Sequence, residues 1–506
     1  MLSRSANCLG LYKYERSVPF RGAVLFAFSM MTFLPMRVSA QEKGLSQTES
    51  LMVNAAVKGT KVDLTENGDP VIRGEVLARI LTGREKAAPS AIYIKKARIT
   101  GDVDPGSIDT RANFTCEACE FANLVDLSDS HFLHDVSFRA SRFAQGLYMT
   151  STKVDGNLDL SQARVHGELD LSYSQIGGSL FAKDMRMRDS NAKAGFDHIR
   201  GASVDFTNLQ INGALSLQRA DIDELFLGSS EEPSILFAKS LDMDVLTARR
   251  ELNIRELTVD SFNAPGLQAL GRTRIAKLTV NEYANLKGAH FQYLIFDDGV
   301  RWPTTDPKRP QPAMELDGIS LAQIDVQKNG FQAPETAWGN LLSEWLDKAA
   351  FSAQPYQEME GAFRSLGRTD LADTTFERMK DRERASKRLS TLGWLKSSVL
   401  SFLVRYGREP YRAFYFGLVI VIIGWIIFRN PKNMTPKQPQ YATKPYSPFW
   451  YSLVLFLPLA NVPDSDVWEP KDDKLGLQVY ARIHSLLGWI LVPIGLAAVS
   501  GLISAK

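Results

Sequence analysis

An apolar residue recurs at every eleventh position between Ile92 and Leu180, and this period constrains the fold more than any other feature of the chain. The column consists of Ile92, Val103, Phe114, Val125, Val136, Leu147, Leu158, Leu169 and Leu180. With 44% hydrophobic residues in the chain, an unbroken column of this length would arise by chance about once in sixteen hundred trials. Neighbouring columns keep the same step, so the sequence predicts a repeat architecture.

The clearest units are VDGNLDLSQAR (154–164) and VHGELDLSYSQ (165–175). Each contains Leu-x-Leu and small-x-Val, two pieces with a period of two, which place apolar side chains on one side of a short strand. Glycines fall between the strands, where corners are expected. Two strands and two corners in each unit exclude an amphipathic helix. We therefore predict a right-handed parallel β-helix, a pentapeptide-like solenoid with about 22 residues per coil and like residues stacked about 4.8 Å apart.

Cys116 and Cys119 form a Cys-x-x-Cys motif inside this repeat. Cys116 lies eleven residues before Leu127, and Cys119 lies eleven before Ser130, so both belong to inward columns. We interpret the pair first as core filling, with a redox or structural disulfide as the alternative. A catalytic thiol pair requires an exposed, electropositive setting, which inward columns do not provide.

The solenoid is expected over residues 91–300 and an N-terminal helical cap over residues 41–90. The proline-rich stretch WPTTDPKRPQP predicts a linker over residues 301–330. Helical stripes on both sides of a glycine predict a helical hairpin over residues 331–389. Residues 1–40 have the layout of a signal peptide, with a basic segment, an apolar run and Val-Ser-Ala at its end; an uncleaved anchor is the alternative.

Residues 390–412 are rich in basic residues and have apolar residues at helical spacing, directly before a hydrophobic stretch. This pattern predicts a basic amphipathic helix that lies on anionic lipid. Its lipid-facing basic residues would be Lys396, Arg405, Arg408 and Arg412.

Residues 413–506 predict an α-helical membrane domain with full spans at 413–428 and 485–504. The short apolar segment 449–459 between them either re-enters or makes a third crossing. Arg482 and His484 are candidate intramembrane polar residues, and their placement in the interfacial region is the alternative.

Several segments together resemble uncharacterised bacterial membrane proteins with a pentapeptide-like β-helix. They are ESLMVNAAVKGTKVDL, the VxGxLDLSxA units, AQPYQEMEGAFRSLGR and GWILVPIGLAAVSGLI. The resemblance covers residues 49–506 and implies the fold and membrane attachment, but no activity. The C-terminal end is also similar in layout to a two-span pore-loop channel. However, VPDSDVWEP stands where potassium channels have their Thr-Val-Gly-Tyr-Gly filter, so a channel here would be degenerate.

A cleaved signal would place the solenoid in the periplasm, or otherwise outside, at the bacterial inner membrane. The basic cluster before the first span favours the alternative of a cytoplasmic solenoid. The net charge of +2 gives no global reason to expect nucleic acid. The partners expected are therefore membrane lipids and an unknown protein partner or self-association. No glycine loop for a dinucleotide or phosphate is present in a strand-to-helix setting, and we predict no cofactor.

Three functions remain open from the sequence. The first is a membrane-anchored scaffold without evident catalysis, and the second is a channel-like or degenerate pore with a solenoid sensor domain. The third is a polysaccharide-acting enzyme, whose outward carboxylates would repeat once per coil. Its candidate residues are Asp126, Ser137, Tyr148, Asp159 and Asp170, although such ladders are ordinary solvent-facing residues. His131 and His134 also take outward positions, but no further ligand at metal-site spacing accompanies them, and we predict neither a catalytic residue nor a metal site.

Overall fold

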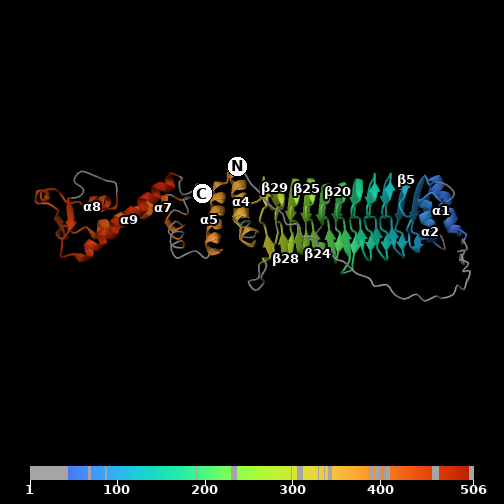
Figure 1. Ribbon diagram of the computed structural model, residues 1–506, viewed down its shortest axis with the longest axis horizontal. Helices are drawn as coiled ribbons and strands as arrows, with labels where there is room; N and C mark the ends of the chain where they lie inside the picture. Colours follow the sequence, from blue (N-terminus) through green and yellow to red (C-terminus); the bar gives the residue numbers. More distant parts are fainter. Residues whose placement is uncertain are drawn as a thin grey trace, which may run out of the picture. The chain divides into compact units, whose positions relative to one another are not determined.

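Short parallel strands stack coil upon coil into a β-solenoid in the computed structural model, and helices follow toward the C-terminus (Figure 1). The structure describes residues 44–65, 70–85, 88–189, 191–229, 236–297, 299–304, 312–328, 330–334, 337–339, 345–386, 393, 398, 401–403, 405, 409, 411–457 and 467–500. The predicted signal peptide, residues 1–40, lies outside the described residues.

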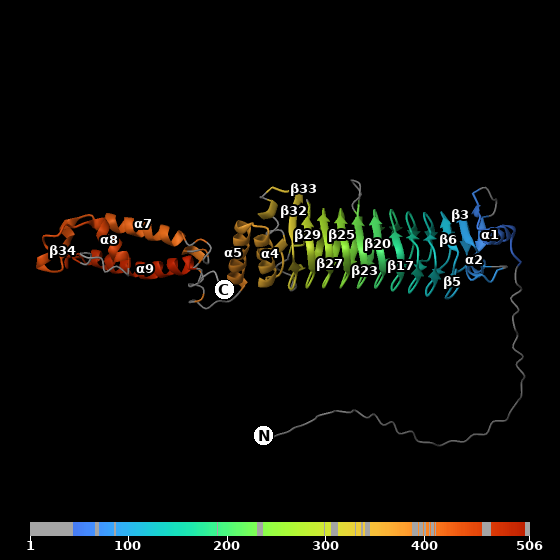
Figure 2. The ribbon, with the colours of Figure 1, turned by 90° about the horizontal axis from the view of Figure 1, so that it is seen from above.

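The strands of the coil belong to three sheets, and Figure 2 labels strands of the largest of them as seen from above. One sheet contains β2 (Val71–Arg73), β4 (Arg98–Thr100), β7 (Glu120–Phe121), β11 (Arg142–Phe143), β15 (Arg164–Val165), β18 (Arg186–Met187) and β21 (Gln210–Ile211). A second contains β8 (Val125–Asp126), β12 (Leu147–Tyr148), β16 (Leu169–Asp170), β19 (Lys193–Gly195), β22 (Ala214–Ser216), β24 (Leu236–Asp242), β26 (Leu257–Asn263), β28 (Thr279–Asn285) and β30 (Met314–Glu315).

The third and largest sheet supplies the rest of the solenoid wall and takes two strands from each early coil. Its strands are β1 (Lys61–Asp63), β3 (Ala91–Lys95), β5 (Asp109–Thr110), β6 (Asn113–Glu117), β9 (His131–Phe132), β10 (Val136–Ser137), β13 (Lys153–Val154), β14 (Leu158–Asp159), β17 (Gln175–Phe181), β20 (Arg200–Thr207), β23 (Asp221–Gly228), β25 (Thr247–Arg255), β27 (Gln268–Ala276), β29 (His290–Phe296), β31 (Ser320–Leu321), β32 (Ile324–Lys328) and β33 (Phe331–Gln332).

The strand register confirms the predicted coil length. Val136 pairs with Phe114 on one side and with Leu158 on the other, each 22 residues away along the chain. Every member of the eleven-residue column from Ile92 to Leu180 is buried. The predicted parallel solenoid of about 22 residues per coil is therefore present, and the hand of the coil stays a prediction.

Corners of the coil hold non-glycine residues in the left-handed backbone region. Ala118, Ala140 and Gln162, one coil apart, have φ of 53°, 55° and 62°, a conformation that side chains rarely adopt. The amide N–H of Ala140 donates to the Ser161 carbonyl one coil away at 2.8 Å. Stacking of identical corners therefore satisfies the backbone groups that such a turn exposes.

Aromatic side chains fill the interior of the early coils. The Phe138 ring lies 5.3 Å from Phe114, 5.9 Å from Phe121 and 5.4 Å from Phe143, measured between ring centroids. All four side chains are fully buried. Edge-to-face contacts of this kind add to the burial of their apolar area.

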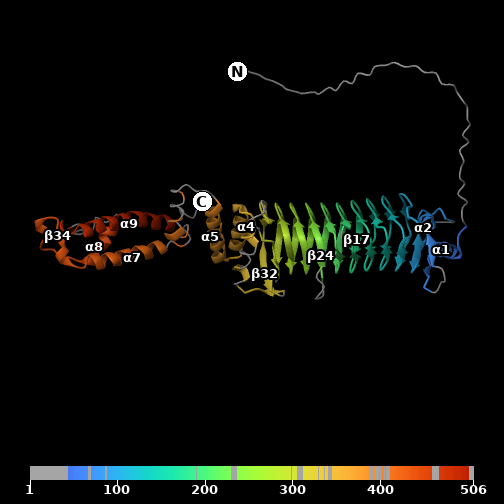
Figure 3. The ribbon, with the colours of Figure 1, turned by 90° about the horizontal axis from the view of Figure 1, so that it is seen from below.

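Helices close both ends of the solenoid, as Figure 3 shows from below. At the N-terminal end lie α1 (Gln47–Lys58) and α2 (Gly74–Leu81). At the other end, the Gln354 side chain at the start of α4 (Ala353–Ser365) donates to the Ile319 carbonyl at 2.6 Å and accepts from the Gly318 amide at 2.9 Å. α5 (Thr369–Ser386) packs against α4 across Gly367, where the sequence predicted a hairpin.

The predicted linker over residues 301–330 is wrong for much of its length, because β30, β31 and β32 continue the solenoid there. Met314 pairs with Ala284 across a coil of 30 residues instead of 22. The proline-rich stretch is thus an excursion from one coil, and residues 305–311 within it lie outside the described residues. The solenoid also begins earlier than residue 91, since β1 pairs with β3.

Three helices lie side by side near the C-terminus, and we call them the helical module: α7 (Tyr411–Ile427), α8 (Pro448–Phe456) and α9 (Leu475–Val499). In the described part of the chain, one helix is long and apolar enough to cross a membrane, over Leu475–Ala497. α9 begins ten residues before the predicted span at 485–504. The prediction counted only uncharged residues, whereas the helix also includes the more polar turns before Ser485. Between α7 and α9, the short strands β34 (Met434–Pro436) and β35 (Trp468–Pro470) pair antiparallel.

Candidate functional site

The outward residues proposed for catalysis stack in register on neighbouring coils. Their carboxylates, however, accept hydrogen bonds from backbone amides in turns. Tyr148 pairs with Asp126 and Asp170 on the neighbouring coils. Asp126 and Asp170 each accept the amide N–H two residues on, from Ser128 at 3.0 Å and from Ser172 at 2.9 Å. Burial, followed by the charge of a nearby glutamate, raises the pKa of Tyr148. A carboxylate that closes a turn in this way already accepts a backbone hydrogen bond and therefore has a structural role.

The neighbouring pair Ser137 and Asp159 behaves in the same way. The two residues are register partners, and Asp159 accepts the Ser161 amide at 2.8 Å. The structure therefore divides the five predicted residues between two sheets, with Asp126, Tyr148 and Asp170 on one and Ser137 and Asp159 on another, and the carboxylates of each set close turns of the backbone.

His131 lies within a compensated charge cluster on the largest sheet. Its Nε2 is 3.0 Å from Asp155 and its Nδ1 is 3.7 Å from Asp109. Hydrogen bonds from Lys153 and then from His131 lower the pKa of the Asp155 carboxyl. His134 is exposed. Within the described ranges, no group of three or more His, Cys, Asp or Glu side chains is placed to hold a metal.

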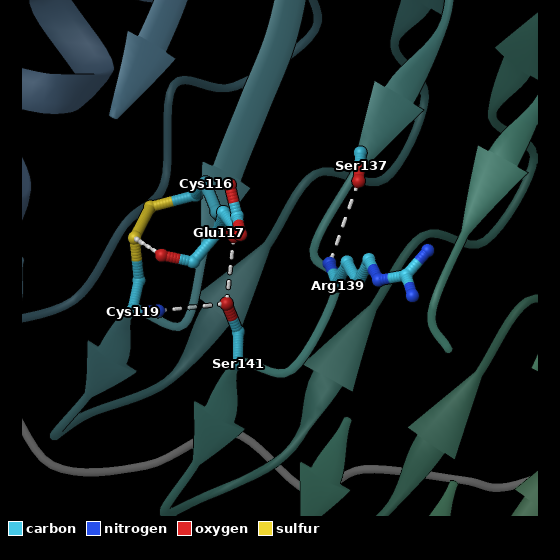
Figure 4. The surroundings of a disulfide bond; sticks show 6 residues. All are labelled: Cys116, Glu117, Cys119, Ser137, Arg139 and Ser141. Carbon is cyan, nitrogen blue, oxygen red and sulfur yellow. Dashed lines mark hydrogen bonds between the residues drawn. A yellow bond between two sulfur atoms is a disulfide. The ribbon is translucent and has the colours of Figure 1, made fainter. Parts of the chain in front are cut away.

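Cys116 and Cys119 both point inward and are joined by a disulfide (Figure 4). The structure thus has the disulfide that the sequence analysis gave as the alternative to simple core filling, and the predicted inward direction is confirmed, since both side chains are buried. The Ser141 hydroxyl donates to the Cys116 carbonyl at 2.7 Å and accepts the Cys119 amide at 3.0 Å. The pair thus has no open, electropositive setting for thiol chemistry.

A column of arginines stands on the seven-stranded sheet, and we call Arg142, Arg164 and Arg186 the arginine ladder. Arg164 pairs in register with Arg142 on one side and with Arg186 on the other. Together with His166 and Arg188, these side chains line a surface hollow of about 190 Å³. In the part of the chain that the structure describes, the three arginines of the ladder form no ion pair.

Like charges stacked one coil apart repel each other. At about 5 Å in water, two unit charges interact by about 1 kcal/mol, and like charges directly opposite on adjacent strands destabilise a sheet. Elsewhere on the solenoid, several basic side chains meet carboxylates on a neighbouring coil. Arg249 contacts Asp221 and Asp223, and Lys277 contacts Glu256 at 3.0 Å. The three arginines of the ladder have no such carboxylate partner among the described residues.

The sequence analysis missed the arginine ladder, although a signal was present. Arginine recurs at 142, 164 and 186 with the 22-residue spacing of one coil. The 22-residue period identifies the ladder when it is applied to charged residues as well as to apolar ones.

Large apolar side chains are exposed around the helical module. Ile426 on α7 and Trp489 on α9 are each 62% exposed. Others on the two helices are Phe414, Tyr415, Leu418, Val419, Ile423, Leu486, Ile490, Leu496 and Val499. Water-soluble proteins rarely expose continuous apolar surface of this extent.

Glycines allow the three helices to approach closely. A Cβ at Gly488 would lie 1.8 Å from the Phe456 carbonyl oxygen, and one at Gly424 would lie 2.2 Å from Ser452 Oγ. Small residues at helix contacts are typical of helices that pack in lipid. α8 itself is about 13 Å long, too short to cross a hydrocarbon layer of about 30 Å.

His484 is fully buried where the three helices meet, whereas Arg482 is exposed. Nε2 of His484 lies 3.0 Å from the Ser452 carbonyl oxygen, which can only accept, so Nε2 carries the proton. Nδ1 then accepts from the Tyr480 hydroxyl at 3.4 Å. Ser452 in turn donates to the Val421 carbonyl at 2.8 Å. The cluster joins α7, α8 and α9 by polar contacts.

The basic residues predicted to face lipid are described only in part, since Lys396 and Arg408 lie outside the described residues. Arg405 pairs with Glu377 of α5, and Arg412 pairs with Glu409. Both of these side chains therefore have protein partners that the sequence pattern did not reveal.

The described residues define the chain as a parallel β-solenoid protein with an exposed apolar helical module. Comparison of the chain with family models, curated proteins and solved structures gives no match.

Proposed function

We propose that this chain is a membrane-anchored β-solenoid scaffold, which presents its outer walls to a binding partner or to a second copy. The observation that carries the proposal is the exposed apolar surface of α7 and α9 beside a solenoid with both ends capped. Lipid would cover that apolar surface. Because helices cap both ends of the solenoid, its outer walls are the surfaces that remain for contact with a partner.

The disulfide supports an exported solenoid, because such bonds persist in oxidising compartments such as the bacterial periplasm. We therefore propose a bacterial inner-membrane location with the solenoid on the periplasmic side. The resemblance to bacterial membrane proteins supports membrane attachment, and the hand of the coil is proposed to be right-handed.

Membrane fractionation tests the anchor. The full chain should remain with membranes after extraction at high salt and high pH, whereas a chain ending at Ser386 should be released. Release of the full chain by salt alone would contradict anchoring by the helical module.

Crosslinking in intact membranes tests the scaffold role. The full chain should form a crosslinked species that disappears when the solenoid, residues 91–328, is deleted. A species that persists after this deletion would contradict binding by the solenoid walls.

The pore and the enzyme have less support. The Phe456 ring packs close to Gly417 and the Phe456 backbone packs close to Gly488, so the three helices meet tightly at this point. The carboxylates proposed for catalysis close backbone turns. Flux of ions through liposomes that contain the purified chain would favour the pore over the scaffold.

A further inference from the structure

We infer that the arginine ladder binds a linear acidic polysaccharide, a polymer with one carboxylate on each sugar. The observation is a row of three exposed or half-exposed arginines, one per coil, that form no ion pair in the described part of the chain and line a hollow.

The positive charges of the arginine ladder are not neutralised by carboxylates in the described part of the fold. At some other places on the solenoid, basic side chains are neutralised across coils, as Arg249 is by Asp221 and Asp223. The carboxylates nearest the hollow do not do this. Asp189 lies 3.9 Å from His166 and accepts the Gly167 amide at 2.8 Å, while Glu120 stands one coil before Arg142 without an ion pair between them. An external anion would supply the missing negative charge.

The periodic geometry favours a polymer. Register partners on parallel strands leave the sheet in the same direction, so the three arginine side chains start from backbone positions spaced about 4.8 Å apart. A guanidinium group binds a carboxylate through two parallel hydrogen bonds. A linear chain of acidic sugars carries one carboxylate on each unit, so that several of its carboxylates can reach arginines of the ladder at once.

Single-stranded nucleic acid fits less well. Proteins that bind it combine a basic groove with aromatic side chains on which bases stack. Among the residues that line the hollow, the one ring is His166, and no Phe, Tyr or Trp contributes.

This inference rests on the proposed function only in using an outer wall of the solenoid for binding. It does not require the membrane anchor or a protein partner, so its failure and the failure of the scaffold proposal are distinguishable.

The test uses the full chain in detergent and a linear oligomer of ten galacturonate units, with affinity measured by isothermal titration calorimetry. The triple variant Arg142→Gln, Arg164→Gln, Arg186→Gln should bind at least about tenfold more weakly. The matched control Arg249→Gln, Arg250→Gln removes basic side chains from a neutralised column and should change the affinity less than about twofold. Added salt should weaken the binding of the unaltered chain.

Hydrogen exchange of the inner strands shows whether the triple variant is folded, and the single variant Arg164→Lys should keep part of the affinity. Three outcomes would overturn the inference: no binding of the oligomer, equal weakening in the control variant, or equal binding of an uncharged oligosaccharide. Tighter binding of polyphosphate or of single-stranded DNA than of the galacturonate oligomer would also overturn it, since the site would then not select sugar carboxylates.

Discussion

The Glu49→Gln substitution should loosen the N-terminal end of the solenoid in a pH-dependent way. The Glu49 side chain is 2% exposed and holds α1 to β2. One carboxylate oxygen accepts the Arg73 amide at 3.0 Å, and the other accepts Nη2 of Arg73 at 2.8 Å and the Ser46 amide at 2.8 Å. Ser46 completes a capping box by accepting the Glu49 amide.

Burial alone would raise the pKa of the Glu49 carboxyl, but the hydrogen bonds from Arg73 and Ser46 outweigh it and lower that pKa from 4.5 to about 2. A depressed pKa stabilises the folded state above the unfolded value, and this stabilisation is lost as the pH falls from about 4.5 to about 2. The difference corresponds to about 3 kcal/mol of local stability. Because a solenoid opens from its ends, the effect should be confined to the first coils.

Hydrogen–deuterium exchange with mass spectrometry measures this directly. At pH 6, peptides from α1 and β2 should exchange on the order of 100-fold faster in Glu49→Gln than in the unaltered chain. Glu75→Gln is the matched control, because Glu75 also pairs with Arg73 at 3.0 Å but is 62% exposed, so its change should stay below about 1 kcal/mol. Equal effects of the two substitutions, or protection of α1 that does not fall between pH 5 and pH 3, would refute the reasoning.

Three further predictions concern the core, the helical module and the arginine ladder. Phe138→Ala should cost about 3–5 kcal/mol in chemical denaturation, because its cavity touches three other rings; a cost below about 1 kcal/mol would contradict the packed interior. Gly488→Leu should disrupt packing at Phe456 and lower the melting temperature of the helical module in detergent, and an unchanged melting temperature would argue against the close approach. Without ligand, Arg164→Gln should leave the stability unchanged or raise it by up to about 1 kcal/mol, whereas Arg249→Gln should lower it slightly; thermal unfolding by circular dichroism compares them, and a clear loss in Arg164→Gln would indicate a partner for that side chain within the fold.

The solenoid was predictable because its repeat is imposed by burial. Each coil places the same few positions inside, so the period persists in residues such as Val136 and Leu158 even where neighbours vary. The later coils were harder to predict, because insertions at corners change the spacing. Ala284 and Met314 are partners across 30 residues, and no fixed period identifies them.

The candidate site was less predictable than the fold. Cys116 and Cys119 were placed inside by the repeat, but the columns alone do not distinguish two thiols from a disulfide. Arg405 pairs with Glu377, which lies in a separate segment of the sequence. The helical spacing that predicted a lipid-facing Arg405 contains no information about such a partner. Charges have no required period on an exposed wall, so the apolar columns did not predict the arginine ladder, although its 22-residue spacing is present in the sequence.

Distances between outward positions test the stacked coil most directly. Ser137 and Asn253 lie on one outward column of the largest sheet, which continues to Asp325 through the register pairs Asp159, Phe181, Asp205, Phe226, Arg274 and Ile295. Spin labels on cysteines at these positions, with Cys8 replaced by serine, can be measured by double electron–electron resonance. Five coils should separate 137 from 253 by about 24 Å, and eight coils should separate 137 from 325 by about 38 Å, so the distance follows the number of coils and not the number of residues. Broad distributions, or a distance to 325 no longer than the distance to 253, would contradict a continuous solenoid.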